Sequence, residues 1–244
     1  MSDPVRSETI AGLDLFRGAA SATCADLAEA VRVDHHRAGA YVGEQGAKVE
    51  RAYALSRGSA RLIQTGADGG QALIRFLGPG DMFATAALFA QGRFPADIVA
   101  LEAVVVLSWP REVLFRIMER DPVVAVNVIR ILGTRLAQLQ ERIREKSFLR
   151  ADQRIALALL RLLDPSGRPQ DAAAITIPLR RQDVAEFAGT TLYTASRIIA
   201  GWEKSRWLKT TGRRLMVLDP AALRRLAEDG VNGSSAATHA AASR

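Results

Sequence analysis

The sequence predicts an α+β protein with a β-rich domain, then one long helix, then a small helical domain that carries a β hairpin. Short apolar runs alternate with glycine turns through residues 31–109, as in domains built from short strands. From residue 122 onward apolar side chains recur at spacings of three and four, which indicates a helix. In residues 180–203 two short apolar stripes flank a glycine. We expect a β domain over residues 1–120, the long helix over 121–149, the helical domain over 150–228 and a disordered tail over 229–244.

The β domain is expected to consist of strands of about five residues. Apolar runs such as Ala52–Leu55 and Ala72–Leu77 are separated by turn signals such as Gly66–Gly70 and Gly78–Asp81. Leu101–Trp109 is expected to be the last strand of this domain.

The long helix is expected to begin with Asp121 as its N-cap and Pro122 as its first residue. Gly133 lowers helix propensity, and it marks either a close approach of two helices or no special contact. The helix either lies across its own β domain or packs on a second copy in a parallel homodimer, and we predict the homodimer. The predicted dimerisation residues are Val124, Val128, Ile131, Leu132, Leu136, Leu139 and, one turn further, Ile143.

The C-terminal domain is expected to be built from short elements. Arg154–Leu163 forms a second apolar-striped helix, and Asp164–Pro169 forms a turn-rich loop. A short strand is expected over Ile175–Leu179, and residues 206–218 predict a β hairpin with its turn at Thr211–Gly212.

The segment between that strand and the hairpin has the pattern of a helix-turn-helix. A first helix is expected to begin at Arg181, a turn lies at Gly189, and Thr191 caps the second helix. The residues expected to face inward are Val184, Phe187 and Ala188, then Ala195, Ile198, Ile199 and Trp202. This leaves Leu192, Tyr193, Ser196 and Arg197 pointing outward, in the layout of a helix whose N-terminal end enters the major groove of DNA.

The outward side chains have the chemistry that contacts with double-stranded DNA require. Arg197 can donate two hydrogen bonds to a guanine, and Tyr193 can touch a phosphate or a thymine methyl group. Taken singly, such arginines are ordinary surface residues and Tyr193 can pack along its helix, so the combined pattern is what favours DNA. The predicted DNA-binding residues are Arg181, Gln182, Thr191, Leu192, Tyr193, Thr194, Ser196, Arg197 and, at the hairpin tip, Arg213 and Arg214.

Charge and composition agree with this interpretation. Residues 150–230 hold 14 Lys and Arg against 9 Asp and Glu, whereas residues 1–149 hold 18 against 17, which suits a polyanion partner in the C-terminal part.

No run approaches the roughly 18 consecutive apolar residues of a membrane helix, and Met1–Pro4 lacks a signal-peptide pattern, so we expect a cytoplasmic protein. No nucleophile–base pair, phosphate loop or metal-ligand cluster has a catalytic spacing, so no enzyme is expected.

The chain resembles the Crp/Fnr family of bacterial transcription regulators over residues 12–227. The resemblance implies an N-terminal β roll like a cyclic nucleotide-binding domain, a dimerisation helix and a C-terminal winged helix-turn-helix. It also implies contact with RNA polymerase through the Pro165–Ala174 loop. The motifs that carry it are Leu13–Phe16, Gly39–Gly46, Leu77–Phe83, Arg154–Leu160, and the helix-turn-helix from Arg181-Gln182-Asp183-Val184-Ala185 to Thr194-Ala195-Ser196-Arg197.

Departures from the family concern the effector and the DNA site. Members that bind cyclic AMP carry a glutamate and an arginine where this chain has Thr85 and the Phe94-Pro95-Ala96 stretch. Loss of the phosphate counter-charge removes on the order of several kcal/mol of charge-assisted hydrogen bonding, so cyclic AMP is not expected. Tyr193 stands where the family has a glutamate, so the DNA half-site should differ from the usual one. The predicted effector pocket comprises Phe83, Ala84, Thr85, Phe94, Pro95 and Ala96.

The family branch that the chain resembles most is that of the nitrogen-oxide regulators of denitrification. That resemblance implies sensing of nitric oxide through haem, with His35 or His36 as the axial ligand. The single cysteine, Cys24, excludes an iron–sulfur sensor, which needs several thiolates. The alternative is a ligand-independent regulator in which Phe83, Phe94 and Pro95 pack a vestigial pocket shut.

Overall fold

The computed structural model of the chain describes residues 6–67, 69–90, 92–163, 175–177, 179–212 and 214–228. The chain divides into two compact units, Met1–Gln138 (unit 1) and Leu139–Arg244 (unit 2), and the division falls inside the long helix. Several predicted features lie outside the described residues. They are the loop at Asp164–Pro169, the Pro165–Ala174 loop expected to contact RNA polymerase, Arg213 at the hairpin tip, and the tail over residues 229–244.

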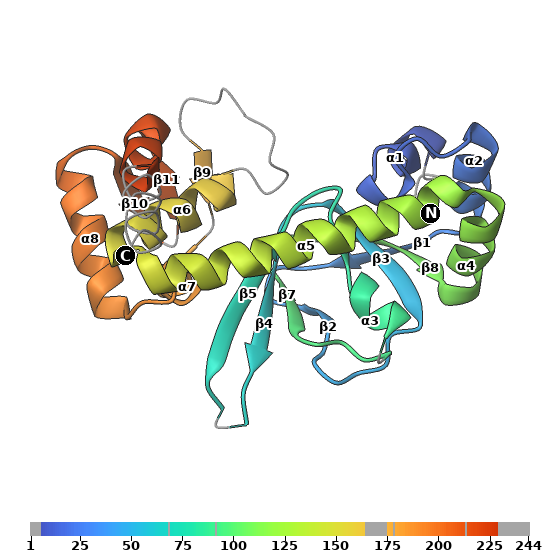
Figure 1. Cartoon of the computed structure of the whole chain (residues 1–244), viewed down its shortest axis with the longest axis horizontal. Coiled ribbons are helices and arrows are strands. Elements are labelled where there is room, and N and C mark those ends of the chain that lie inside the picture. The colour runs from blue at the N-terminus through green and yellow to red at the C-terminus, as the bar shows by residue number, and fades with distance from the viewer. Residues whose placement is uncertain are drawn as a thin grey trace, which may run out of the picture. The chain divides into compact units, whose positions relative to one another are not determined.

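Unit 1 is a β roll flanked by helices (Figure 1). Its elements are α1 (Ser7–Ala11), the 3-10 helix η1 (Asp14–Phe16), α2 (Ser21–Ala30), β1 (Arg32–His36), β2 (Tyr41–Gly43), β3 (Arg51–Arg57), β4 (Ala60–Thr65), β5 (Gln71–Leu77), β6 (Met82–Phe83), α3 (Thr85–Phe89), β7 (Asp97–Ala100), β8 (Val104–Pro110), α4 (Arg111–Arg120) and the first part of α5 (Pro122–Phe148).

The roll consists of two four-stranded antiparallel sheets, with strand orders β1-β8-β3-β6 and β2-β7-β4-β5. Ala54 and Val106 from the first sheet and Leu77 and Ile98 from the second belong to one buried apolar cluster, so both sheets share a core. The tight turn between β3 and β4 requires glycine, because a Cβ at Gly58 would lie 2.4 Å from a backbone oxygen.

The last strand of unit 1 differs from the prediction. It begins at Val104 rather than Leu101, because residues 101–103 form a bend, and it extends to Pro110. The ten residues that follow form α4, a helix that was not among the predicted elements although Leu114 and Ile117, three residues apart, are both buried.

The long helix α5 is present, but its first turns are used differently than predicted. As predicted, α5 begins at Pro122 with Asp121 directly before it, and the carboxylate of Asp121 also accepts a hydrogen bond from the Ala20 N–H, 2.8 Å away at the start of α2. Val124 and Val128 are buried in the core of unit 1, so these two residues are not available to a second copy. Asn127 lies between them and donates to the carbonyl oxygen of Leu15, at 2.9 Å.

Unit 2 is a winged helix-turn-helix. Three strands form one small antiparallel sheet in the order β10-β11-β9, which confirms the predicted hairpin. Besides the last turns of α5, the elements are α6 (Ala151–Leu163), β9 (Ile175–Ile177), α7 (Arg181–Phe187), α8 (Leu192–Lys204), β10 (Leu208–Thr211), β11 (Arg214–Val217) and a helical segment over residues 220–228. The predicted α+β fold is therefore confirmed, with α6 beginning three residues earlier than expected.

Candidate DNA-binding surface and effector site

The turn between α7 and α8 has the predicted geometry. Gly189 adopts a φ of +62°, a left-handed conformation that favours glycine. Thr191 caps α8, because its hydroxyl oxygen accepts a hydrogen bond from the Thr194 N–H at 3.1 Å. The buried residues of the two helices include Val184, Ala185 and Ala188 in or next to α7, and Ala195, Ile199 and Trp202 in α8.

The outward face of α8 carries a large aromatic side chain next to an arginine. Tyr193 is 79% exposed and Leu192 is 46% exposed. Arg197 lies one turn beyond Tyr193 and is also exposed, whereas Ser196 is half-buried. The structure thus presents Tyr193 and Arg197 together, on the side of α8 opposite its buried stripe.

At the start of α7 two of the predicted DNA-binding residues already have partners within the protein. Arg181 forms an ion pair with Glu203 of α8, with 2.7 Å between Nη2 and Oε2. Gln182 donates to the Glu186 carboxylate at 2.7 Å. Burial alone would raise the pKa of Glu203, but hydrogen bonds from Thr210 and the charge of Arg181 outweigh it and lower that pKa. Arg181 therefore ties α7 to α8 rather than standing free for DNA.

An arginine that the sequence analysis did not assign to the site holds the turn in place. Arg154 of α6 donates from Nε to the carbonyl oxygen of Ala188, at 3.0 Å, and from Nη1 to that of Leu149, at 2.7 Å. These bonds satisfy carbonyl groups at the ends of α7 and α5. The signal was present in the sequence, because Arg154 opens the Arg-Ile-Ala motif. On the hairpin, Arg214 is exposed.

The predicted effector pocket contains an aromatic cluster. Phe83 stacks on Tyr53 with 5.3 Å between ring centroids, and Phe94 lies 5.7 Å from the same ring. Phe83 and Phe94 are both buried. Phe94 also covers the backbone of Gly43, where a Cβ would lie 2.8 Å from the ring. The structure thus brings Phe83 and Phe94 together through Tyr53, which the sequence analysis did not name.

The remaining pocket residues are small or differently placed. Ala84 adopts a left-handed conformation with a φ of 55°. Thr85 is buried, and its hydroxyl has no hydrogen-bond partner among the residues that the structure describes. Ala96 is buried, whereas Pro95 is exposed and so does not help to close the pocket.

The two histidines are not part of this cluster. They lie on β1, at one edge of the sheet whose other edge is β6 with Phe83. Three strand spacings of about 4.8 Å separate the two edges. His35 is exposed and His36 is half-buried. No group of three His, Cys, Asp or Glu that could hold a metal occurs within the described part of the chain. The residues present therefore do not fit a haem held by His35 or His36 next to the predicted pocket.

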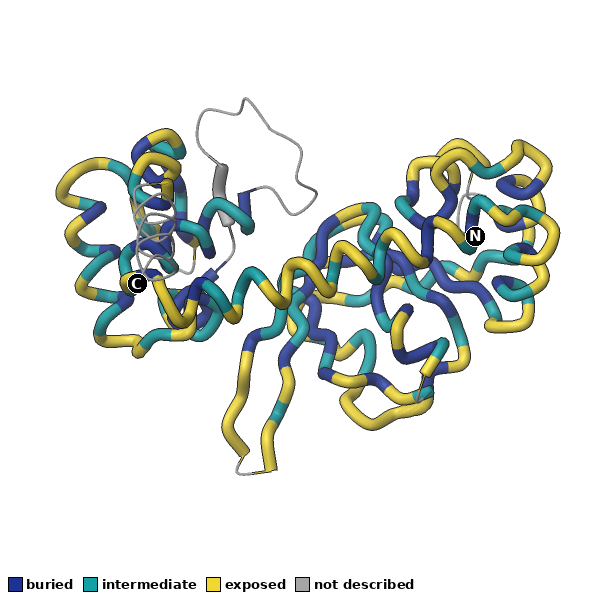
Figure 2. Tube along the Cα trace, viewed as in Figure 1, coloured by how far each residue is buried: buried dark blue, intermediate teal, exposed yellow. Residues whose placement is uncertain are grey.

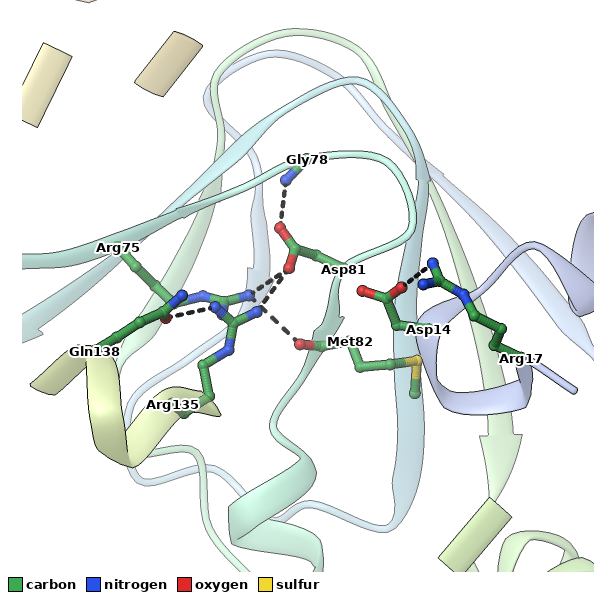
Figure 3. A network of polar contacts seen from close by, with 8 residues as sticks. All are labelled: Asp14, Arg17, Arg75, Gly78, Asp81, Met82, Arg135 and Gln138. Carbon is green, nitrogen blue, oxygen red and sulfur yellow. Dashed lines mark hydrogen bonds and ion pairs between the residues drawn. The ribbon is translucent and has the colours of Figure 1, made fainter. Parts of the chain in front are cut away.

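A polar network connects the turn before β6 to α5 (Figure 3). The Asp81 carboxylate accepts from the Gly78 N–H at 2.9 Å, from Arg135 of α5 at 2.8 Å and from Arg75 of β5 at 3.2 Å. The side chain of Asp81 is 11% exposed.

Exposed residues recur along α5 (Figure 2), and several of them are large and apolar. Ile129, Leu136 and Ile143 are exposed and seven residues apart, and Leu139 is exposed between the last two. Ile131 and Leu132 are partly buried against the core of unit 1.

By length and composition α5 could also cross a membrane, because an 18-residue window of this helix has a mean hydropathy of 1.2. Its apolar side chains form a one-sided stripe, however, as expected for a helix that packs on another helix. Val126 is a further exposed residue that was not predicted.

The fold and these surfaces together define a class of protein: a DNA-binding transcription regulator with an effector-binding domain. Residues 33–121 match the family described as the cyclic nucleotide-binding domain, and residues 153–226 match the Crp-like helix-turn-helix domain. The cyclic AMP receptor protein of Thermus thermophilus is 31% identical over 159 residues, which cover 65% of this chain and 69% of that protein. The chain belongs to the Crp/Fnr family.

Other relatives differ in the effectors and processes that their names describe. A CRP-like cAMP-activated global transcriptional regulator of Mycobacterium tuberculosis is 23% identical over 221 residues, covering 90% of this chain and 99% of that protein. The nitrogen fixation regulation protein FixK of Azorhizobium caulinodans is 29% identical over 180 residues, covering 72% and 71%. The solved structure of FixK2 from Bradyrhizobium japonicum has the same fold, with a TM-score of 0.69, 21% identity and coverage of 80% and 96%. These relatives support the family but not the denitrification branch.

Proposed function

We propose that the protein is a cytoplasmic homodimer that regulates transcription by binding a near-palindromic DNA site, with one α8 helix in each half-site. The observation that carries the proposal is the outward face of α8, where exposed Tyr193 and Arg197 stand on a helix fixed by its cap and by Arg154. In a two-fold dimer such helices enter successive major grooves about 34 Å apart. By the family resemblance RNA polymerase is the proposed partner in transcription.

The exposed stripe on α5 supports the homodimer. Ile129, Leu136 and Ile143 occupy one heptad position, and Leu132 and Leu139 occupy the position three residues later. Burying each of the exposed members, Ile129, Leu136, Leu139 and Ile143, against a second copy gains up to about 1.5–3 kcal/mol, whereas Leu132 is already partly buried. The parallel seam therefore uses the stripe from Ile129 to Ile143, without Val124 and Val128, which the core of unit 1 already buries.

We propose that an effector of unit 1, where one binds, is small and lacks a phosphate group. Phe94-Pro95-Ala96 supplies no charge where cyclic-AMP-binding relatives carry an arginine, and Phe94 is buried. The Thr85 hydroxyl is a buried hydrogen-bonding group that such an effector can use. An effector acts by favouring one arrangement of the dimer over another. Nitric oxide bound to haem is not proposed, because the histidines lie at the far edge of the sheet.

A second candidate is a regulator that needs no ligand. The stacking of Tyr53, Phe83 and Phe94, with Phe94 pressed on Gly43, favours a pocket filled by the protein's own side chains. Pro95, the third residue expected to close the pocket, is exposed and does not contribute.

A titration on the full-length protein tests the proposed function. DNA affinity is measured by fluorescence anisotropy without ligand and with cyclic AMP, and cyclic AMP binding is measured by isothermal titration calorimetry. We expect no heat of binding and no change in DNA affinity. Micromolar binding of cyclic AMP that raises DNA affinity would contradict the proposed effector class, while full specific binding without ligand would favour the second candidate.

A further inference from the structure

The most exposed part of α8 has a composition that limits which bases it can read. Residues 191–197 contain no Asp or Glu, so this face has no carboxylate to accept a hydrogen bond from cytosine N4. It also has no Asn or Gln for the two-bond contact to adenine. The hydroxyls of Thr191 and Thr194 are bonded to each other at 3.0 Å and belong to the helix cap. Arg197 and Tyr193 are therefore the two longest side chains of this stretch that can contact bases, beside the shorter and less exposed Leu192.

Tyr193 and Arg197 point to the same side of α8 from different positions along its axis. They are four residues apart, so they lie on one side of α8 and about 6 Å apart along its axis. That distance is roughly two base-pair steps of 3.4 Å. On this side of the next turn stands Gly201, where an added Cβ would meet no atom within 4 Å, and the next long side chain on this side is the exposed Lys204 at the end of α8. Two positions of a half-site, about two base pairs apart, are thus contacted by an arginine and by an aromatic ring.

We propose that Tyr193 is a specificity-determining residue that contacts the 5-methyl group of a thymine about two base pairs from the guanine bound by Arg197. A methyl group is the one feature of the major-groove base edges that an apolar ring edge can recognise. The 79% exposure of Tyr193 leaves its ring free to make that contact. This inference rests on the proposed entry of α8 into the major groove.

The experiment begins by selecting high-affinity duplexes from a random library with the full-length protein at low salt. In the selected half-site each thymine is then replaced in turn by deoxyuridine, which removes the methyl group and keeps every hydrogen bond. For wild type we expect one position at which this replacement weakens binding about fourfold, the effect of losing one buried methyl group. Tyr193→Ala should bind the thymine and deoxyuridine duplexes equally, whereas Tyr193→Phe, which keeps the ring, should discriminate as wild type does.

Other results would overturn the inference. Wild type that tolerates deoxyuridine at every position rules out a methyl contact. If Tyr193→Ala and Tyr193→Phe weaken binding to selected and scrambled DNA alike, Tyr193 uses its hydroxyl on a phosphate instead. If the library yields no enriched sequence although wild type binds DNA, the assignment of sequence-specific recognition to α8 fails along with the inference.

Discussion

At the scale of single residues, the helix-turn-helix divides its arginines into structural and exposed ones. Arg181 and Arg154 bond to groups of unit 2, whereas Arg197 forms no ion pair with any residue that the structure describes. Neutralising Arg181 should therefore affect the folding of unit 2 first and its DNA contacts second. Neutralising Arg197 is expected to weaken DNA binding first and to affect the folding of unit 2 little.

The Glu203 carboxylate gives unit 2 a predictable dependence on pH. Its pKa in the folded protein lies below the usual 4.5, so the unfolded chain takes up a proton first as the pH falls. The stabilisation is complete above about pH 4.5 and is lost below it, as the pH falls through the folded pKa. Glu203→Gln should lower the free energy of unfolding by about 1–2 kcal/mol at pH 7.

Urea unfolding of wild type and Glu203→Gln between pH 7 and pH 3 measures this effect. The difference between the two proteins should shrink as the pH falls below 4.5. Glu228→Gln, at an exposed position near the end of the described chain, serves as the control and should match wild type. A constant difference across the range would show that the Glu203 charge does not contribute.

Residue-level prediction from the sequence succeeded where helical spacing alone decides the outcome. The buried stripe at Ala195, Ile199 and Trp202 and the exposed Arg197 follow from a period of 3.6. The pairing of Arg181 with Glu203 did not follow, because it joins residues that tertiary packing brings together from two helices.

At the scale of elements, Asp81 connects the β5–β6 turn to α5. Its carboxylate lies between Arg75 and Arg135 and is nearly buried. Asp81→Asn removes the charge and leaves two arginines facing each other in a partly buried site. Because Arg135 stays 32% exposed, we expect a loss of about 1–3 kcal/mol in the stability of unit 1, less than for a fully buried pair.

The matched control for this substitution is Asp14→Asn in the same unit. The Asp14–Arg17 pair, also drawn in Figure 3, has both side chains nearly half exposed, so its loss should cost about 0–1 kcal/mol. Thermal unfolding followed by calorimetry compares the two variants. Equal effects would mean that the Asp81 network adds nothing beyond an ordinary surface ion pair.

The stripe on α5 makes a prediction about assembly. Leu136→Asp places a charge in the centre of the proposed seam and should convert the dimer to monomers at micromolar concentration. Thr134→Asp introduces the same charge at an exposed position on the side of the helix away from the heptad stripe, and it should leave the dimer intact. Sedimentation velocity distinguishes the two species. A Leu136→Asp protein that sediments like wild type would contradict the proposed seam.

Elements were predicted well where one periodicity runs without interruption, as in α5 and the β10–β11 hairpin. The assignment of Val124 and Val128 to the dimer was wrong because one apolar repeat serves two partners along a single helix. Its first turns pack on the β roll, and the exposed stripe begins further on. Periodicity shows which face of a helix is apolar, but not what covers it.

At the scale of the whole molecule, the order of domains and the identity of the DNA-binding unit could be predicted from motifs and charge. The effector could not, because the pocket is defined by strands that pair across long sequence separations. The family resemblance implied that Thr85 and Phe94 replace charged residues, whereas the Tyr53–Phe83–Phe94 cluster emerged only from the fold. The sequence likewise could not show that His35 and His36 lie at the opposite edge of the sheet from Phe83, because the strand order β1-β8-β3-β6 is a property of the fold.

The proposed recognition of DNA sequence by the outward face of α8 can be measured in a competition experiment. The full-length Arg197→Ala protein is compared with wild type and with Arg37→Ala, which removes an equal charge from an exposed site in unit 1. Binding to the selected site is measured against scrambled competitor DNA. We expect Arg197→Ala to remain dimeric and to lose about 1–3 kcal/mol of discrimination, with Arg37→Ala unchanged. Discrimination by Arg197→Ala equal to that of wild type would contradict the account.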